Sequence, residues 1–177
     1  IGEMGGGGLG HWQGVPMAFL VREGLERGKT LDDVLTIFRE NPRTCEYFYV
    51  VADAKTNEAV GMEASWDVME VIRPGEAHPL LPSPVKDCAL LSAGSRYEEL
   101  VRRVEAGHGR FTAETAMKLM ERPVAMKSNL HNVLFEPKTT RFWVANAGSD
   151  GSPAAEQAYH AFQLSELLKR KPDADAE

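Results

Sequence analysis

Apolar residues recur at helical spacing in two neighbouring segments near the start of the chain. They are Met17, Leu20, Val21 and Leu25 in the first segment and Leu31, Val34, Leu35 and Phe38 in the second. Such spacing predicts two amphipathic helices, over residues 17–26 and 31–40. Pro16 suits a first helical turn and Gly28 suits a helix end. Thr30 with Asp33 three residues later has the pattern of a capping box, and Asn41-Pro42 ends the second helix.

The pattern then changes to β-branched and aromatic residues. The stretches CEYFYVVAD (45–53) and AVGMEASWDVMEVI (59–72) predict two or three antiparallel strands. Four prolines within residues 73–84 predict a loop or an extended crossing. The stretch SNLHNVLFEPKTTRFWVANAG (128–148) predicts a hairpin whose turn is at residues 136–139.

Two further helices are expected between these strand regions. One covers residues 95–106, and the other starts at residues 111–112 with Thr112 as N-cap and ends near Met120. The glycine-rich stretch 5–10 predicts a loop, and the charged residues 169–177 predict a disordered tail. This order predicts an α+β domain over residues 1–168.

Composition narrows the classes of partner. The chain has 177 residues, 43% of them hydrophobic and 26% charged, which suits one domain with a core of its own. A net charge of -6 argues against a nucleic-acid or anionic-membrane surface, and no apolar run is long enough to span a bilayer. The two cysteines fit neither a disulfide framework nor a zinc site. The compartment stays open.

Local chemistry supplies few candidate sites. The glycines lack the Lys-Ser/Thr pair of a phosphate-binding loop, so a mobile loop beside a site is favoured over nucleotide binding. Cys45 and Cys88 have no neighbouring base, which favours small core residues over nucleophiles. His11 lies in the glycine loop, where it is placed to line a pocket. Arg96 stands in a first helical turn, where a cation opposes the helix dipole and needs a specific partner; Glu99 is the simplest one.

Four stretches, taken in order, resemble a known family. GVPMAFLVREGLERGKTLDDVLTIFRENPR (14–43) is similar to a Gly-x-Pro helix followed by a second helix, and CEYFYVVADAKTNEAVGMEAS (45–65) to a strand pair ending in Glu. LLSAGSRYEELVRRV (90–104) is similar to a Ser-x-Arg-Phe/Tyr helix start, and residues 128–148 to a late hairpin. These features resemble the isopenicillin N acyltransferase family (peptidase family C45 type). That family belongs to the N-terminal-nucleophile hydrolases and is related to choloylglycine hydrolases and penicillin V acylases.

The resemblance implies a four-layer αββα sandwich and a cysteine-nucleophile amidohydrolase or acyltransferase. Such enzymes act on N-acyl amides or acyl thioesters, mature by self-cleavage and need no cofactor or metal. Neither cysteine here matches the family nucleophile, so the nucleophile is expected upstream of Ile1 and the chain alone is expected to be inactive. The expected partners are a small N-acyl substrate, a missing N-terminal segment or sister chain, and a second copy in a homo-oligomer, because missing strands would leave sheet edges unpaired.

Residue by residue, Arg96 matches the family arginine that supports the active site. The asparagine that donates to the oxyanion in many relatives should fall within GEAHPLLPSP (75–84), where His78-Pro79 stands instead. His78 is therefore a candidate replacement donor or substrate-binding residue, together with His11, and Glu63 is assigned a structural role. Two alternatives stay open: a non-catalytic relative that binds a ligand or partner, and an unrelated nucleotide-binding domain.

Overall fold

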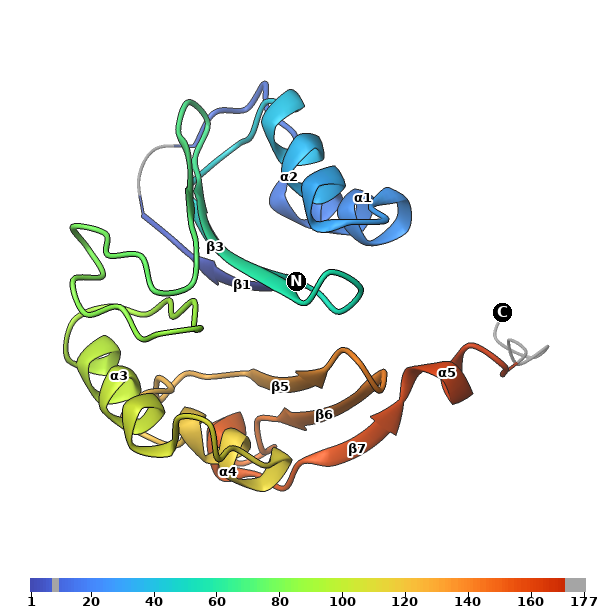
Figure 1. Cartoon of the computed structure of the whole chain (residues 1–177). Coiled ribbons are helices and arrows are strands. Elements are labelled where there is room, and N and C mark those ends of the chain that lie inside the picture. Colours follow the sequence, from blue (N-terminus) through green and yellow to red (C-terminus); the bar gives the residue numbers. More distant parts are fainter. Residues whose placement is uncertain (8–9, 171–177) are drawn as a thin grey trace. The chain divides into compact units, whose positions relative to one another are not determined.

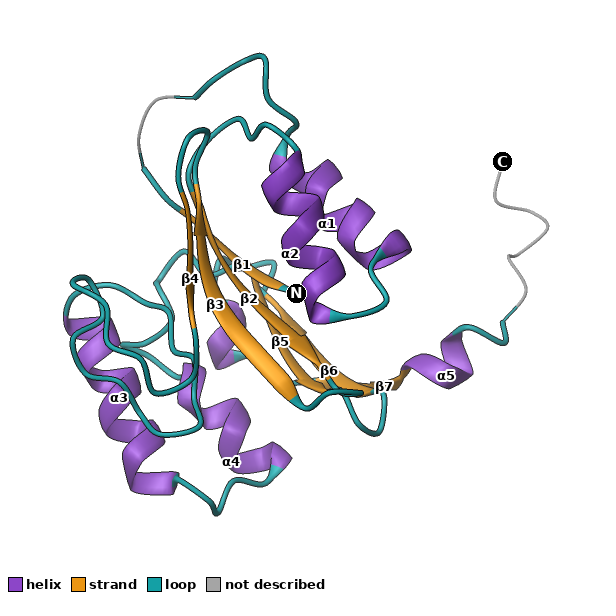
Figure 2. Ribbon diagram, turned by 45° about the horizontal axis from the view of Figure 1, so that its top comes forward, coloured by secondary structure: helices purple, strands orange, loops and turns teal. Residues whose placement is uncertain are grey.

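The computed structural model describes residues 1–7 and 10–170, and the chain divides into two units, residues 1–101 and 102–177. Four antiparallel strands form the sheet of the first unit (Figure 2). They are β1 (Gly2–Gly5), β2 (Tyr47–Asp53), β3 (Glu58–Ala64) and β4 (Met69–Ile72), paired in that order. Because side chains alternate along a strand, this register gives the sheet two chemically distinct faces.

The helices α1 (Met17–Arg27) and α2 (Leu31–Glu40) pack against one face of this sheet (Figures 1 and 2). Phe38 is fully buried there, with its ring centroid 4.8 Å from that of Tyr49. Leu20, Val60 and Met62 complete the centre of this core. Burying such side chains contributes roughly 1.5–3 kcal/mol each.

The capping box of α2 forms as the sequence predicts. The Asp33 amide donates to Thr30 Oγ1 at 3.2 Å, and the Thr30 amide donates to the Asp33 carboxylate at 3.0 Å. The Lys29 amide donates to the same carboxylate at 2.9 Å. Together with the Thr30 side chain, this bond holds the pKa of Asp33 below its ordinary value.

The other face of the first sheet is lined by a long irregular segment, residues 73–94. Leu81 and Val85 of this segment are buried, and Leu91 lies against Gly61 of β3. A Cβ at Gly61 would approach the Leu91 side chain to 3.1 Å. The absence of a side chain at Gly61 therefore lets the segment pack closely against β3. The Tyr97 hydroxyl donates to the Ser83 carbonyl at 2.8 Å and ties the segment to α3 (Ser95–Gly107), which crosses the boundary between the units.

The second unit contains an antiparallel sheet of β5 (His131–Glu136), β6 (Arg141–Asn146) and β7 (His160–Gln163). Short helices surround it: α4 (Ala113–Met117), η1 (Lys118–Met120), η2 (Ala154–Glu156) and α5 (Leu164–Leu167). Thr112 caps α4 as predicted, and Thr115 completes its capping box.

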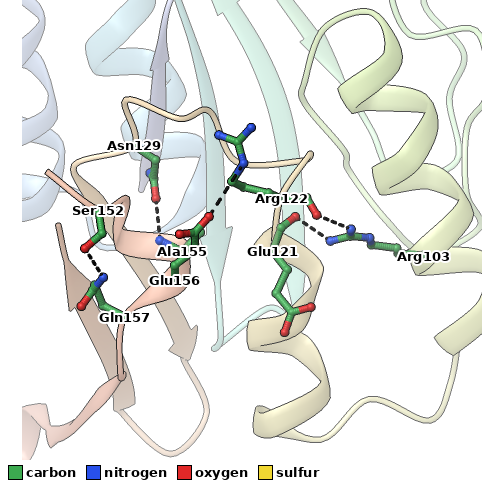
Figure 3. A network of polar contacts seen from close by, with 8 residues as sticks. All are labelled: Arg103, Glu121, Arg122, Asn129, Ser152, Ala155, Glu156 and Gln157. Carbon is green, nitrogen blue, oxygen red and sulfur yellow. Dashed lines mark hydrogen bonds and ion pairs between the residues drawn. The ribbon is translucent and has the colours of Figure 1, made fainter. Parts of the chain in front are cut away.

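Two polar side chains organise the loops of this unit (Figure 3). The Arg103 guanidinium donates to four backbone carbonyls, among them Glu121 at 2.7 Å and Arg122 at 3.0 Å, which closes the end of η1. The Asn129 side chain accepts from the Ala155 amide at 3.0 Å and donates to the His131 carbonyl at 2.9 Å. These bonds fix η2 beside the start of β5.

The prediction of an α+β chain is confirmed, and both sheets are antiparallel. The expected strand region 59–72 is two strands, and the hairpin 128–148 forms with Glu136 paired to Arg141. Four elements of the described chain were not expected: β1, η2, β7 and α5. Gly5, predicted in a loop, ends β1 opposite Tyr47.

Two predicted segments fall partly on residues that are not described. Gly8 and Leu9 of the glycine stretch lie outside the described residues, as does 171–177 of the predicted charged tail. Among the helices of residues 1–7 and 10–170, none combines the length and apolar character that crossing a bilayer requires.

Candidate functional site

A pocket of about 200 Å³ lies in the first unit, against the sheet face that does not carry α1 and α2. Its apolar walls come from Met4, Phe48, Ile72, Leu80, Leu81 and Leu91. Three polar residues interrupt this apolar lining: Glu63, His78 and Ser92. Residues 92–94 form the rim of the pocket immediately before α3. A small apolar pocket with a few convergent polar groups is the usual form of a ligand site.

The strand register places three of the pocket residues in one row across the sheet, with Glu70 next to them. Met4 pairs with Phe48, Phe48 with Glu63, and Glu63 with Glu70. Directly paired residues of antiparallel strands point to the same face, so these four side chains share it. Two carboxylates therefore stand side by side at the β3–β4 end of the row.

His78 completes a cluster with these carboxylates. Its Nε2 lies 3.0 Å from the Glu70 carboxylate, and its Nδ1 accepts from the Leu80 amide at 3.2 Å. Both bonds are satisfied together when the proton is on Nε2 and Nδ1 is bare. In this hydrogen-bond pattern Nε2 of His78 donates to Glu70 and Nδ1 is an acceptor.

Glu63 has no hydrogen bond or ion pair with any described residue of its unit. Partial burial raises the pKa of its carboxyl group, and the neighbouring Glu46 and Glu70 carboxylates raise it further, while His78 opposes them. Desolvation and like charges both disfavour the ionised form of an acid. An unpaired carboxyl group in an apolar wall is therefore the chemically unusual feature of this pocket.

Arg96 is half-buried in the first turn of α3, two residues beyond Gly94 at the rim. It forms no hydrogen bond or ion pair with Glu99 or with any other described residue of the first unit. The simple surface pair suggested by the sequence is therefore not formed. A half-buried guanidinium keeps five donors for another partner.

His11 lies elsewhere in the first unit. Its ring stacks on Trp66 with centroids 4.2 Å apart and an interplanar angle of 8°. It is not among the residues that line the pocket. The two histidines predicted to bind substrate therefore do not meet at this pocket.

The glycine-rich segment is held close to the chain before β2. The Gly6 amide donates to the Glu46 carbonyl at 3.1 Å. Gly14 approaches the Arg43 carbonyl so closely that a Cβ there would lie 2.2 Å away. Gly14 is required by this close approach of two backbones.

Neither cysteine has the surroundings of a nucleophile. Cys88 is half-buried, and burial together with Asp87 raises the pKa of its thiol, which disfavours the reactive thiolate. Cys45 lies beside the Thr44 hydroxyl, with Sγ 3.4 Å from Oγ1. These environments agree with the interpretation of both residues as small packing residues.

Glu63, Glu70 and His78 also form a possible metal-ligand set, with one potential ligand atom from each lying within 4.8 Å of the others. The tautomer of His78 weighs against this use. A metal at Nε2 would displace the proton given to Glu70, while Nδ1 already accepts from Leu80. Metal-bound histidines normally donate from their second nitrogen.

A second, more open depression of about 680 Å³ lies in the second unit. One side is formed by α4 and η1, and the other by η2. Three glutamates, Glu114, Glu121 and Glu156, line it together with Lys118 and Tyr159. Arg122 partly balances them, with Nε 3.8 Å from the Glu156 carboxylate (Figure 3). Its lining is about as polar as it is apolar and is open to solvent.

Sequence reasoning missed the pairing of Glu63, which lines the pocket, with Glu70 beside it. Their alternation within residues 59–72 was the available signal, because each is a charged residue on a mostly apolar strand. It also missed the buried Arg43, whose guanidinium donates to the Phe38, Ser65 and Val68 carbonyls. Arg43 is committed to the fold and has no donor aimed at the pocket.

Comparison with known proteins gives one distant similarity. No family model matches the chain. The chain is similar to protein dcd1B of Dictyostelium discoideum, with 23% identity over 180 residues. The match covers 90% of this chain and 36% of the relative, so the chain spans little more than a third of the length of that protein.

Proposed function

We propose that residues 1–168 are part of a cysteine-nucleophile amidohydrolase or acyltransferase with the four-layer αββα fold of the N-terminal-nucleophile hydrolases. The substrate is an N-acyl amide or acyl thioester, and a segment outside these 177 residues supplies the nucleophile. The observation that carries the proposal is Arg96, which is half-buried and has no hydrogen-bond or ion-pair partner among the described residues of its unit. Arg96 lies two residues after Gly94, which is at the rim of the pocket. The two antiparallel sheets with helices are compatible with this fold.

The proposed chemistry uses one residue as nucleophile and base. The α-amino group of an N-terminal cysteine takes the thiol proton, and the sulfur attacks the acyl carbonyl. The C–N bond breaks as the same amino group returns the proton to the leaving amine, which leaves an acyl-thioester. Water or a second amine then releases the acyl group. Arg96 acts here by holding charge near the reacting carbonyl.

His78 is better suited to substrate binding than to the oxyanion site. Its only N–H faces the Glu70 carboxylate, so donation to an oxyanion would first require loss of that bond. Its place in the pocket wall beside Glu63 instead positions it against a bound group.

A direct test expresses the whole gene that encodes this chain. We expect intact mass and N-terminal sequencing to find a product chain that begins with Cys, and N-acyl amides to be hydrolysed. Arg96→Gln should lower kcat/KM on the order of 100-fold, Arg96→Lys should restore part of it, and Arg22→Gln, at an exposed ion pair, should change nothing. Products without an N-terminal Cys, or equal activity of Arg96→Gln and the parent protein, would contradict the proposal.

One observation favours a second candidate function. Residues 73–84 contain no asparagine, and His78 is engaged with Glu70. A relative that had lost the oxyanion donor would keep the pocket as a ligand-binding site without turnover. Ligand binding by a protein whose product chains lack a new N-terminal Cys would favour this alternative.

A further inference from the structure

We propose that the pocket at Glu63 binds the ammonium group of an organic amine, with the apolar part of that amine against Phe48, Leu80 and Leu91. Resting on the proposed function, the inference means that the N-acyl substrate carries a free amino group at the end held in this pocket. Neither the family resemblance nor the comparison supplies this specificity. It follows from the arrangement of charge and apolar surface within the first unit.

Acidic side chains gather around Glu63. Glu63 and Glu70 are directly paired across β3 and β4, and Glu46 lies near enough to affect the Glu63 carboxyl group. His78 is engaged with Glu70, with its Nε2 3.0 Å from that carboxylate, and forms no hydrogen bond with Glu63. No described lysine or arginine of the unit pairs with Glu63. The pocket wall therefore offers a carboxylate without a lysine or arginine partner in its unit.

The groups at the pocket suit an ammonium ion better than a divalent metal ion. An ammonium offers three N–H donors and needs only acceptors. Glu63 in the pocket wall supplies them, and the Glu70 carboxylate lies beside it. A divalent ion would gain two carboxylates but not the proton-bearing Nε2, and hard cations prefer additional oxygen ligands or water. The remaining wall is mostly apolar, and Ser92 is its one further polar side chain among the described residues.

The volume of the pocket limits the size of the group that it can bind. At about 200 Å³ the pocket is smaller than the roughly 300–1,000 Å³ typical of complete small-molecule sites. It suits one end of a substrate, such as an aminoethyl group with a small aromatic or aliphatic body. The rim at residues 92–94 leads from this pocket to the start of α3, where Arg96 stands.

The test measures binding of a simple probe to residues 1–177 and requires no turnover. Titration calorimetry would compare 2-phenylethylamine, which is an ammonium ion at pH 7, with 2-phenylethanol, its neutral analogue of similar shape. We expect at least tenfold tighter binding of the amine. Glu63→Gln should abolish the difference between the two probes. The matched control, Glu58→Gln, removes a charge from the same strand at an exposed position and should preserve it.

Several outcomes overturn the inference. Equal affinity for amine and alcohol, or an unchanged amine affinity in Glu63→Gln, removes the role of the carboxylate. Binding of Mg²⁺ or Zn²⁺ alone that depends on Glu63, without binding of the amine, replaces the ammonium site by a metal site. Hydrolysis of neutral N-acyl amides by the product of the whole gene, with no amine binding by this chain, sinks the inference and leaves the proposed function intact.

Discussion

At the scale of single residues, Glu63 combines an apolar wall, two acidic neighbours and no cation of its own unit. Its pKa is raised first by partial burial and then by the charges of Glu46 and Glu70, with His78 opposing. A folded-state pKa above the unfolded one means that the folded chain binds more protons between the two values. The contribution of Glu63 protonation to the free energy of unfolding is therefore fully present below the ordinary pKa of a glutamate. It is lost as the pH rises through the raised pKa of the folded chain.

The corresponding prediction concerns Glu63→Gln. An amide keeps the shape of the carboxyl group without its charge, so the variant should be more stable than the parent chain at pH 7 and nearly equal to it at pH 4. We expect the denaturant midpoint difference to grow between these pH values. The Glu58→Gln control should show a constant difference. A stability gain for Glu63→Gln that is largest at pH 4 would contradict the assigned cause.

The sequence identified His78 and Arg96 as residues of interest but not the group that joins His78 to the sheet. Glu63 and Glu70 are close because β3 and β4 pair in one particular register. A shift of one residue would have turned one of the carboxylates to the opposite face. Local sequence patterns do not specify that register, so the cluster becomes visible only with the strands in place.

At the scale of elements, the amphipathic helices and their caps were the most predictable parts of the chain. Each depends on neighbours within one or two turns, and α1, α2 and α3 lie within two residues of their expected bounds. By contrast, β1 is a four-residue strand with glycine at both ends, and β7 is equally short. These strands are defined by pairing with β2 and β6, which are distant in sequence.

The cap of α2 gives a prediction at this scale. Thr30→Ala removes the hydroxyl that accepts the Asp33 amide and leaves a helix-end donor without its partner. We expect a loss of about 1 kcal/mol in the free energy of unfolding, measured by denaturant titration. Thr56→Ala, in the exposed turn between β2 and β3, should change stability by much less. Equal effects of the two variants would show that the capping box contributes nothing to stability.

At the scale of the whole molecule, net charge and exposed apolar surface act against each other. The chain carries a net charge of -6 and has a sequence pI near 5.4. One face of the β5–β6–β7 sheet carries Val133, Phe135, Phe142, Val144 and Phe162, and the Phe142 and Phe162 rings stack at 5.2 Å. Exposed apolar patches of this kind promote association when charge repulsion is weak.

We therefore expect the chain to associate most strongly near pH 5.4 and much less at pH 8, as measured by light scattering at fixed protein concentration. Phe135 is 54% exposed on this face, and Phe135→Lys should suppress the association near the pI. Leu25→Lys makes the same charge change at a residue that is 65% exposed on α1, so it controls for charge alone. If both variants reduce scattering equally, net charge governs association and the aromatic face does not. If Phe135→Lys alone reduces it, the face is the contact, and the effect should be reproduced by Phe162→Lys on the neighbouring strand.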